Sequence, residues 1–298
     1  MVVAGSVALD SIETPSTNRK DLLGGSACFA CLAASFFSNP GLLGIVGRDF
    51  PVDYTDLLEK YHVDLIGLQR DLTGNTFRWA GVYNCDMNSR RTLSTDLGVF
   101  CNFSPRVPDS YRKASYVLLA NISPGLQLEV LDQIENPVFV AADTMDLWIN
   151  TERENLLKLH KRIDLLFLND SEAEAWTGMG NPLLAAGKLL EDGPKYVVIK
   201  KGSHGSMLFS KDSIFVLPAV PLEECADPTG AGDSFAGGFM GFLAGKGEVS
   251  WSTLKEAMAF GTALASFCVE SFSADGFRSA DLNTINARVT LLREISKF

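Results

Sequence analysis

The sequence predicts an α/β fold, a doubly wound and mostly parallel β-sheet flanked by helices, with a small β-sheet lid. Two observations predict it. Nearly continuous apolar runs, such as Ile163-Asp-Leu-Leu-Phe-Leu168 and Tyr196-Val-Val-Ile199, alternate with helical segments, which is typical of parallel strands covered on both faces. From Gly74 to Phe103 the residue pattern changes, because Thr, Arg, Trp, Val, Tyr and Asn alternate with turn residues there. That pattern predicts hairpin strands with one wet face.

The elements follow in a regular order. The chain begins with an apolar strand at 2–9 that ends at Asp10, then a small-residue helix at 26–37, a strand at 42–46 and a helix at 52–61. Further strands are expected at 115–120, 137–142, 163–168 and 195–200, with helices at 125–134, 151–159, 171–177 and 182–191. A hairpin at 206–216, a glycine-rich junction at 227–233 and helices at 234–245, 251–269 and 282–295 follow. We expect one domain over residues 1–298, with a discontinuous lid at about 11–22 and 72–104.

Composition narrows the class of protein. The chain has 298 residues, of which 46% are hydrophobic, so a globular protein with a large core is expected. The formal net charge of -10 argues against nucleic acid or an anionic membrane as a partner. No run is long enough to span a bilayer, and the N-terminus lacks the basic start of a signal peptide. The six scattered cysteines suggest no disulfide framework, so a cytoplasmic location is expected.

The strongest motif is Asp227-Pro-Thr-Gly-Ala-Gly-Asp233 at the start of a predicted helix. Its glycines let the backbone turn sharply and leave N–H groups unobstructed. The first turn of a helix also has unpaired N–H groups and a partial positive charge, so the motif predicts an anion site suited to a phosphate. Asp233 stands at the mouth of that site, where a carboxylate can accept the proton of an attacking hydroxyl. The non-functional alternative is an ordinary glycine turn before a helix.

The whole string resembles the C-terminal signature of the PfkB (ribokinase-like) carbohydrate kinase family. The resemblance covers nearly the whole chain, including the lid, and implies an ATP- and Mg²⁺-dependent kinase acting on a sugar-like hydroxyl. It assigns the role of base to Asp233 and an anion hole to the amides of Gly230, Ala231 and Gly232. Asp227 and Thr229 match positions beside which the family often binds a monovalent cation, and K⁺ use is left open. The resemblance also suggests a homodimer formed through the lids.

The resemblance carries a substrate site over to Asp10, Gly24 and Gly25. A carboxylate can accept hydrogen bonds from sugar hydroxyls, and glycines let a substrate lie against the backbone. The glycines taken alone also fit a turn and a helix cap. Phe29 departs from the family, which commonly has asparagine five residues after the first glycine. We therefore expect Phe29 to help shape the acceptor pocket, and the acceptor stays open between a sugar, a nucleoside, an inositol and a sugar phosphate.

Two further strand ends match the family's nucleotide site. Asn169 and Glu172 resemble its NxxE motif, which helps to organise Mg²⁺ and the phosphates; a capping box of Ser171 and Glu174 is a compatible alternative. Lys200 lies where the family usually has threonine, so it either supplies positive charge to the nucleotide or is a solvated turn lysine. Gly202 carries over as a nucleotide contact.

Other functions fit less well. The lid arginines Arg78, Arg90 and Arg91 either contact an anionic substrate or face water. The glycine pattern of a dinucleotide-binding dehydrogenase, the P-loop of an NTPase and the GxSxG of an esterase are all missing from the sequence. A nucleoside kinase on the same fold, or a non-catalytic nucleotide or sugar sensor, remains as the alternative.

Overall fold

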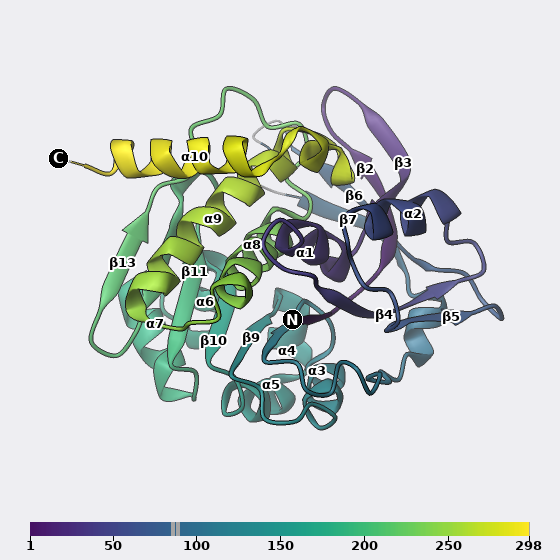
Figure 1. Ribbon diagram of the computed structural model, residues 1–298, viewed down its shortest axis with the longest axis horizontal. Coiled ribbons are helices and arrows are strands. Elements are labelled where there is room, and N and C mark those ends of the chain that lie inside the picture. The colour runs from purple at the N-terminus through teal and green to yellow at the C-terminus, as the bar shows by residue number, and fades with distance from the viewer. Residues whose placement is uncertain (85–86, 88–89, 298) are drawn as a thin grey trace.

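A computed structural model describes residues 1–84, 87 and 90–297, and these form two sheets (Figure 1). The larger sheet has the strand order β13-β12-β11-β10-β9-β8-β1-β4-β5, and the smaller one has the order β3-β2-β6-β7. The large sheet is parallel from β5 to β11, and only β12 and β13 are antiparallel. The predicted fold class is therefore confirmed. The large-sheet strands are β1 (Val2–Ala4), β4 (Gly41–Gly47), β5 (Leu68–Asp71), β8 (Tyr116–Leu119), β9 (Phe139–Asp143), β10 (Leu165–Asn169), β11 (Tyr196–Lys200), β12 (Ser206–Phe209) and β13 (Ile214–Leu217).

Helices cover both faces of the large sheet, which explains the continuous apolar runs. In β10, Leu165 and Phe167 join one core while Leu166 and Leu168 join the other. The first core includes α1 (Ser26–Ala34), α2 (Val52–Lys60), α8 (Ala231–Lys246), α9 (Trp251–Val269) and α10 (Leu282–Ile295). The second includes α3 (Pro124–Leu131), α4 (Asp146–Thr151), α5 (Arg153–His160), α6 (Asp170–Thr177) and α7 (Pro182–Glu191). The predicted single helix at 151–159 is instead the pair α4 and α5, which meet at Glu152.

The small sheet consists of β2 (Ala8–Glu13), β3 (Asn18–Gly24), β6 (Phe77–Tyr83) and β7 (Arg90–Asp96). The expected strand at 2–9 is wrong in one respect, because it breaks between β1 and β2. At the break the Ser6 N–H donates to Ser26 Oγ, and the Ser6 carbonyl accepts from the Ala27 N–H. These bonds to the start of α1 replace sheet bonds and send the chain into the small sheet. Asp10 therefore lies within a lid strand and not at the end of a core strand.

The glycines of α8 have a packing role. An added Cβ at Gly237 or Gly241 would meet the backbone of Ala30 or Ala34 in α1, at 2.1 and 2.6 Å. A Cβ at Gly238 would lie 2.7 Å from Leu264 of α9. These glycines therefore let α8 approach α1 and α9 closely. That close contact fixes the start of α8 against the start of α1.

Cys28, Cys31 and Cys268 are buried free thiols, as the sequence predicts for the first two, while Cys85 lies outside the described residues. In the described part of the chain, no single helix has the length and apolar composition to cross a membrane. Among the described residues, α9 and the 3-10 helix Ser273–Ser279 reach that length and composition only when they are taken together, and the two are bent by 116° relative to each other. All seven residues of β7, in the lid, are exposed. The homodimer expected to form through the lids stays a prediction.

Candidate active site

The glycine motif forms a tight turn into the first turn of α8. Gly230 is the N-cap of this helix, with φ of 78°, in the left-handed region that favours glycine. Since Gly230 has no side chain, no side chain caps the first N–H groups of α8. Asp233 is the acidic residue of this first turn. The turn thus puts the helix dipole and the start of α8 beside a carboxylate, although the Ala231 N–H already donates to the Pro228 carbonyl at 3.2 Å.

Phe29 lies beneath this turn. A Cβ built on Gly230 would stand 2.4 Å from Phe29 Cγ, so the ring packs directly against the glycine. The side chain is only 2% exposed. Its position on buried α1 puts the ring under the turn. Phe29 therefore supports the turn, and its part in shaping the acceptor pocket stays a prediction.

Burial and neighbouring charges set the ionisation of Asp233. Burial, followed by the charge of Asp143, raises the pKa of its carboxyl to about 7. The positive charges of Lys200 and Arg90 act in the opposite direction. A carboxyl with a pKa near neutrality can accept a proton from a hydroxyl and release it again.

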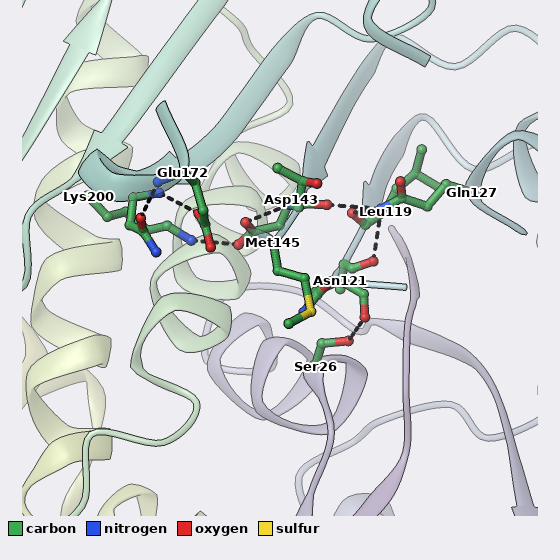
Figure 2. Close-up of polar contacts among 11 residues, drawn as sticks. Ser26, Leu119, Asn121, Gln127, Asp143, Met145, Glu172 and Lys200 are labelled. Atoms are coloured by element: carbon green, nitrogen blue, oxygen red, sulfur yellow. Dashed lines mark hydrogen bonds and ion pairs between the residues drawn. The ribbon is translucent and has the colours of Figure 1, made fainter. Parts of the chain in front are cut away.

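Three adjacent strands deliver polar side chains to this point (Figure 2). Asp143 ends β9, Asn169 ends β10 and Lys200 ends β11. Lys200 Nζ lies 2.6 Å from Asp143 Oδ2, and these side chains are 16% and 5% exposed. The alternative of a solvated turn lysine is therefore wrong. Sequence patterns missed Asp143, whose only signal is its position at the end of an apolar strand.

Asn169 and Glu172 themselves form the capping box of α6. Asn169 Oδ1 accepts from the Glu172 N–H at 2.8 Å, and Glu172 Oε2 accepts from the Asn169 N–H at 2.7 Å. The expected box of Ser171 and Glu174 is wrong, because β10 and α6 meet with no residue between them. Burial raises the pKa of Glu172 to about 7, while the charge of Lys200 lowers it. The capping box thus holds a buried carboxylate next to Lys200.

Asp10, Gly24 and Gly25 form a second group at the lid. A Cβ on Gly24 would lie 2.0 Å from Asp10 Oδ2, so the missing side chain makes room for the carboxylate. Gly25 has φ of 94°, and a Cβ there would meet the Ser6 carbonyl oxygen at 2.4 Å. Burial, followed by the charges of Asp227 and Asp233, raises the pKa of Asp10 to about 8. This electrostatic coupling links the lid group to the glycine turn.

Asp227 is completely buried beneath the same turn. Its Oδ1 accepts from the Thr229 N–H at 2.9 Å, while Oδ2 has no hydrogen-bond partner among the described residues. The Thr229 hydroxyl bonds the Tyr83 hydroxyl at 2.9 Å, and this bond joins the lid to the turn. Tyr83 has no sequence signal beyond its place in a hairpin strand. An orphaned buried carboxylate oxygen is a donor suited to a cation.

A cavity of about 770 Å³ opens on the other side of the turn. Lys200, Gly202, Ala231 and Gly232 line it, so four of the predicted site residues share one space. The segment 218–225, which sequence reasoning missed, and part of α9 form its remaining walls. Phe235, Ala265 and Val269 give it an apolar side.

The lid arginines Arg78 and Arg90 have different roles. Arg78 pairs with Asp21 and with Asp49, so it joins the lid to the loop after β4. Arg90 lies over the Trp79 ring at 5.5 Å, and its charge lowers the pKa of Asp233. Arg90 therefore faces the site, whereas Arg78 has a structural role.

Comparison with known proteins decides the family. Residues 3–280 match the pfkB family carbohydrate kinases. The chain belongs to this family. It is 30% identical over 251 residues to the cytidine kinase of Thermococcus kodakarensis. That alignment covers 80% of this chain and 87% of the cytidine kinase. It is 26% identical over 262 residues to a nucleoside kinase of Methanocaldococcus jannaschii, across 88% and 83% of the two chains. The family is one of ATP-using kinases, so the chain is a kinase that phosphorylates a sugar-like small molecule.

Solved structures agree on the fold. The crystal structure of the Methanocaldococcus jannaschii nucleoside kinase matches with a TM-score of 0.79 at 24% identity, over 97% of this chain and 98% of that one. The Burkholderia thailandensis nucleoside kinase in complex with inosine matches with a TM-score of 0.79 at 18% identity, over 98% of each chain. At these identities the likeness extends to the fold alone.

The site's donor set fits Mg²⁺. Asp143 and Glu172 offer the hard carboxylate oxygens that Mg²⁺ prefers, close to the predicted phosphate site. No preformed group of three metal-ligating side chains occurs among the residues that the structure describes. That is compatible with Mg²⁺, which usually keeps several waters and takes its other ligands from phosphates.

Proposed function

We propose that the chain transfers the γ-phosphoryl group of ATP to a ribose hydroxyl of a nucleoside, with Asp233 as the general base. The observation that carries the assignment of the base is the position of Asp233 in the first turn of α8, beside the amides of Gly230–Gly232. In the proposed reaction the acceptor hydroxyl gives its proton to Asp233, and its oxygen bonds to the γ-phosphorus. The bond to the β-phosphate oxygen breaks and ADP leaves.

The turn and the cavity provide the remaining functions. The amides of Gly230 and Gly232 would stabilise charge that develops on the transferred group, and the Ala231 amide would join them on release of its bond to the Pro228 carbonyl. The cavity lined by Gly202 and the 218–225 segment has the size for the rest of the nucleotide. Mg²⁺, when bound, neutralises phosphate charge, and Asp143 and Glu172 are the residues that would hold it through water.

The inner face of the lid favours a nucleoside over a simple sugar. Because Tyr83 reaches Thr229, the face of β6 that carries Trp79, Gly81 and Tyr83 is directed at the active-site turn. Trp79 pairs directly with Asp10 across β2 and β6. Its ring lies across Gly81, where a Cβ would approach Trp79 Cη2 to 2.2 Å. An aromatic platform beside the hydroxyl-binding carboxylate suits a base attached to a ribose.

An acceptor panel tests this proposal. With ATP and Mg²⁺, we expect ADP release with cytidine, adenosine or inosine at a lower KM than with free ribose or fructose. Trp79→Ala is expected to raise the nucleoside KM about 10-fold, because one base–aromatic stack contributes about 1–3 kcal/mol, and to leave the KM for ribose nearly unchanged. Trp79→Phe is the conservative control. ATP binding without turnover of any acceptor in the panel would favour the sensor alternative instead.

The orphaned oxygen of Asp227 makes a second prediction. We propose that a monovalent cation such as K⁺ binds Asp227 Oδ2 and the backbone near Thr229. We expect kcat to rise several-fold when K⁺ replaces Li⁺ at constant ionic strength, and the Tm to rise with it, because the cation pairs with a buried carboxylate. Asp227→Asn should remove both responses. An equal Tm in KCl and LiCl for the unmodified protein would contradict the cation site.

A further inference from the structure

Lys200 stands where three adjacent parallel strands end, inside the cavity next to the glycine turn. Its Nζ lies 3.1 Å from the position of a Cβ built on Gly232, within the anion turn itself. The same nitrogen donates to Asp143 Oδ2 at 2.6 Å. Figure 2 shows Lys200 extending from the end of β11 toward Asp143, with Glu172 beside it. Lysine at this position thus joins the carboxylate cluster to the predicted phosphate site.

A purely structural ion pair is a poor explanation of this arrangement. Burying a lysine and a carboxylate removes both from water, and the attraction between them often only balances that cost. The lysine also serves more than one carboxylate, because Asp143, Glu172 and Asp233 all raise its pKa. Lys200 is the cation that lies inside this cluster, in a chain whose formal net charge is -10, while Arg90 acts on Asp233 from the lid. An ATP polyphosphate approaching the turn needs a positive group there.

Asp143 is rigidly held, as a group that aims another side chain must be. Its Oδ1 accepts from the Thr144 N–H at 2.9 Å, and its backbone carbonyl accepts from Gln127 Nε2 at 3.0 Å. Gln127 is completely buried and also donates to the carbonyls of Leu119 and Ala120. These bonds tie the end of β9 to the end of β8, so the Asp143 carboxylate has one fixed direction.

We propose that Lys200 contacts the phosphoryl group being transferred, and that Asp143 is the positioning residue that holds its Nζ beside the turn. The inference rests on the proposed function, because it assumes that the turn binds the γ-phosphate. Lys200 keeps its proton throughout and acts as a charge-assisted hydrogen-bond donor. The guiding carboxylate prevents its flexible stem from pointing elsewhere when the nucleotide is absent.

Nucleotide affinities of Lys200→Met test the contact. We expect its affinity for ATP, measured calorimetrically in EDTA and again with Mg²⁺, to fall about 10-fold or more, since a charge-assisted bond is lost. Its affinity for ADP should change by less than about threefold, because ADP lacks the transferred group. We expect kcat to fall about 10²–10³-fold, the usual effect of removing one donor to developing charge. Lys201→Met is the matched control, because this adjacent lysine is not among the described residues that line the cavity.

A charge-neutral double variant separates this role from structural pairing. Lys200→Met/Asp143→Asn removes both charges, so a purely structural pair predicts recovery of Tm together with the preference for ATP over ADP measured in EDTA, where no Mg²⁺ is bound, and that recovery would overturn the proposal. We expect recovery of Tm alone, with kcat and the preference for ATP over ADP still low. Asp143→Asn alone keeps the cation and should lower kcat without removing that preference. Equal losses of ATP and ADP affinity in Lys200→Met would also overturn the proposal. If Asp233 is not the base, in contrast, the ATP and ADP affinities of Lys200→Met are unaffected, so the two failures can be told apart.

Discussion

Replacing Asp233 by asparagine is expected to lower kcat about 10³-fold or more, within the range of about 10²–10⁴ that general acid–base catalysis contributes. The amide cannot accept the hydroxyl proton, while its shape keeps the first turn of α8 intact. The affinity for ATP should stay within about threefold of the unmodified protein, because the anion-binding amides do not depend on the carboxylate. Isothermal calorimetry and a coupled ADP assay on the same preparation measure both quantities. A kcat near that of the unmodified protein would remove Asp233 from the role of base.

The pH dependence of the unmodified enzyme provides an independent check on the role of Asp233. Because the pKa of Asp233 is raised to about 7, kcat/KM of the unmodified enzyme should increase between pH 6 and pH 8 as the base ionises. A carboxyl whose folded pKa exceeds its unfolded value binds an extra proton in the folded state. Its contribution to stability is therefore lost as the pH rises through about 4 to 7.

It follows that Asp233→Asn should be more stable than the unmodified protein at pH 8, by about 2–4 °C in Tm. The difference should shrink as the pH falls from about 7 toward 4, because the folded carboxyl takes up its proton over that range. A variant that loses activity while gaining stability cannot have lost activity through misfolding. Asp53→Asn is the matched control, since Asp53 is an exposed first-turn acid of α2 and should change neither quantity.

Residue patterns predicted the parts of the molecule that depend on local chemistry. Apolar runs such as 163–168 identify strands covered on both faces, because successive side chains point to opposite faces and both faces must be buried. The Asp227–Asp233 motif identifies the anion turn, since glycine at Gly230 is required by its positive φ. For these features, the cause lies within a few residues of the effect, and one sequence is sufficient.

Other features depend on contacts between distant segments, and these escaped sequence reasoning. The strand at 2–9 breaks because Ser6 bonds Ser26, twenty residues away. Asp143 enters the site because β9 lies next to β10, and Tyr83 because its hydroxyl meets Thr229. Nothing in the local sequence around these residues distinguishes them from ordinary strand or hairpin positions. Phe29 is the clearest case, because its partner Gly230 is two hundred residues further along the chain.

The contact between Phe29 and Gly230 makes the second large prediction. In Gly230→Ala, the added Cβ would overlap the buried ring, at 2.4 Å from its Cγ, and alanine would also occupy a left-handed conformation. The conformation alone costs about 1–2 kcal/mol. Because the ring is enclosed, relief of the overlap requires the turn to move, and a displacement of about 1 Å there can cost 10²-fold in rate. We expect kcat to fall at least that far, with a Tm lower by several degrees.

Gly247→Ala is the control that isolates the overlap. Gly247 ends the same helix in the same left-handed region, with φ of 69°, but an added Cβ there meets nothing within 4 Å. It should lower Tm slightly and leave kcat unchanged. In Phe29→Leu/Gly230→Ala, the smaller side chain under the turn should restore part of the lost kcat relative to Gly230→Ala. If Gly230→Ala lost no more activity than Gly247→Ala, the buried ring would have no part in holding the anion turn, and the substitution of phenylalanine for the family's usual asparagine would need another explanation.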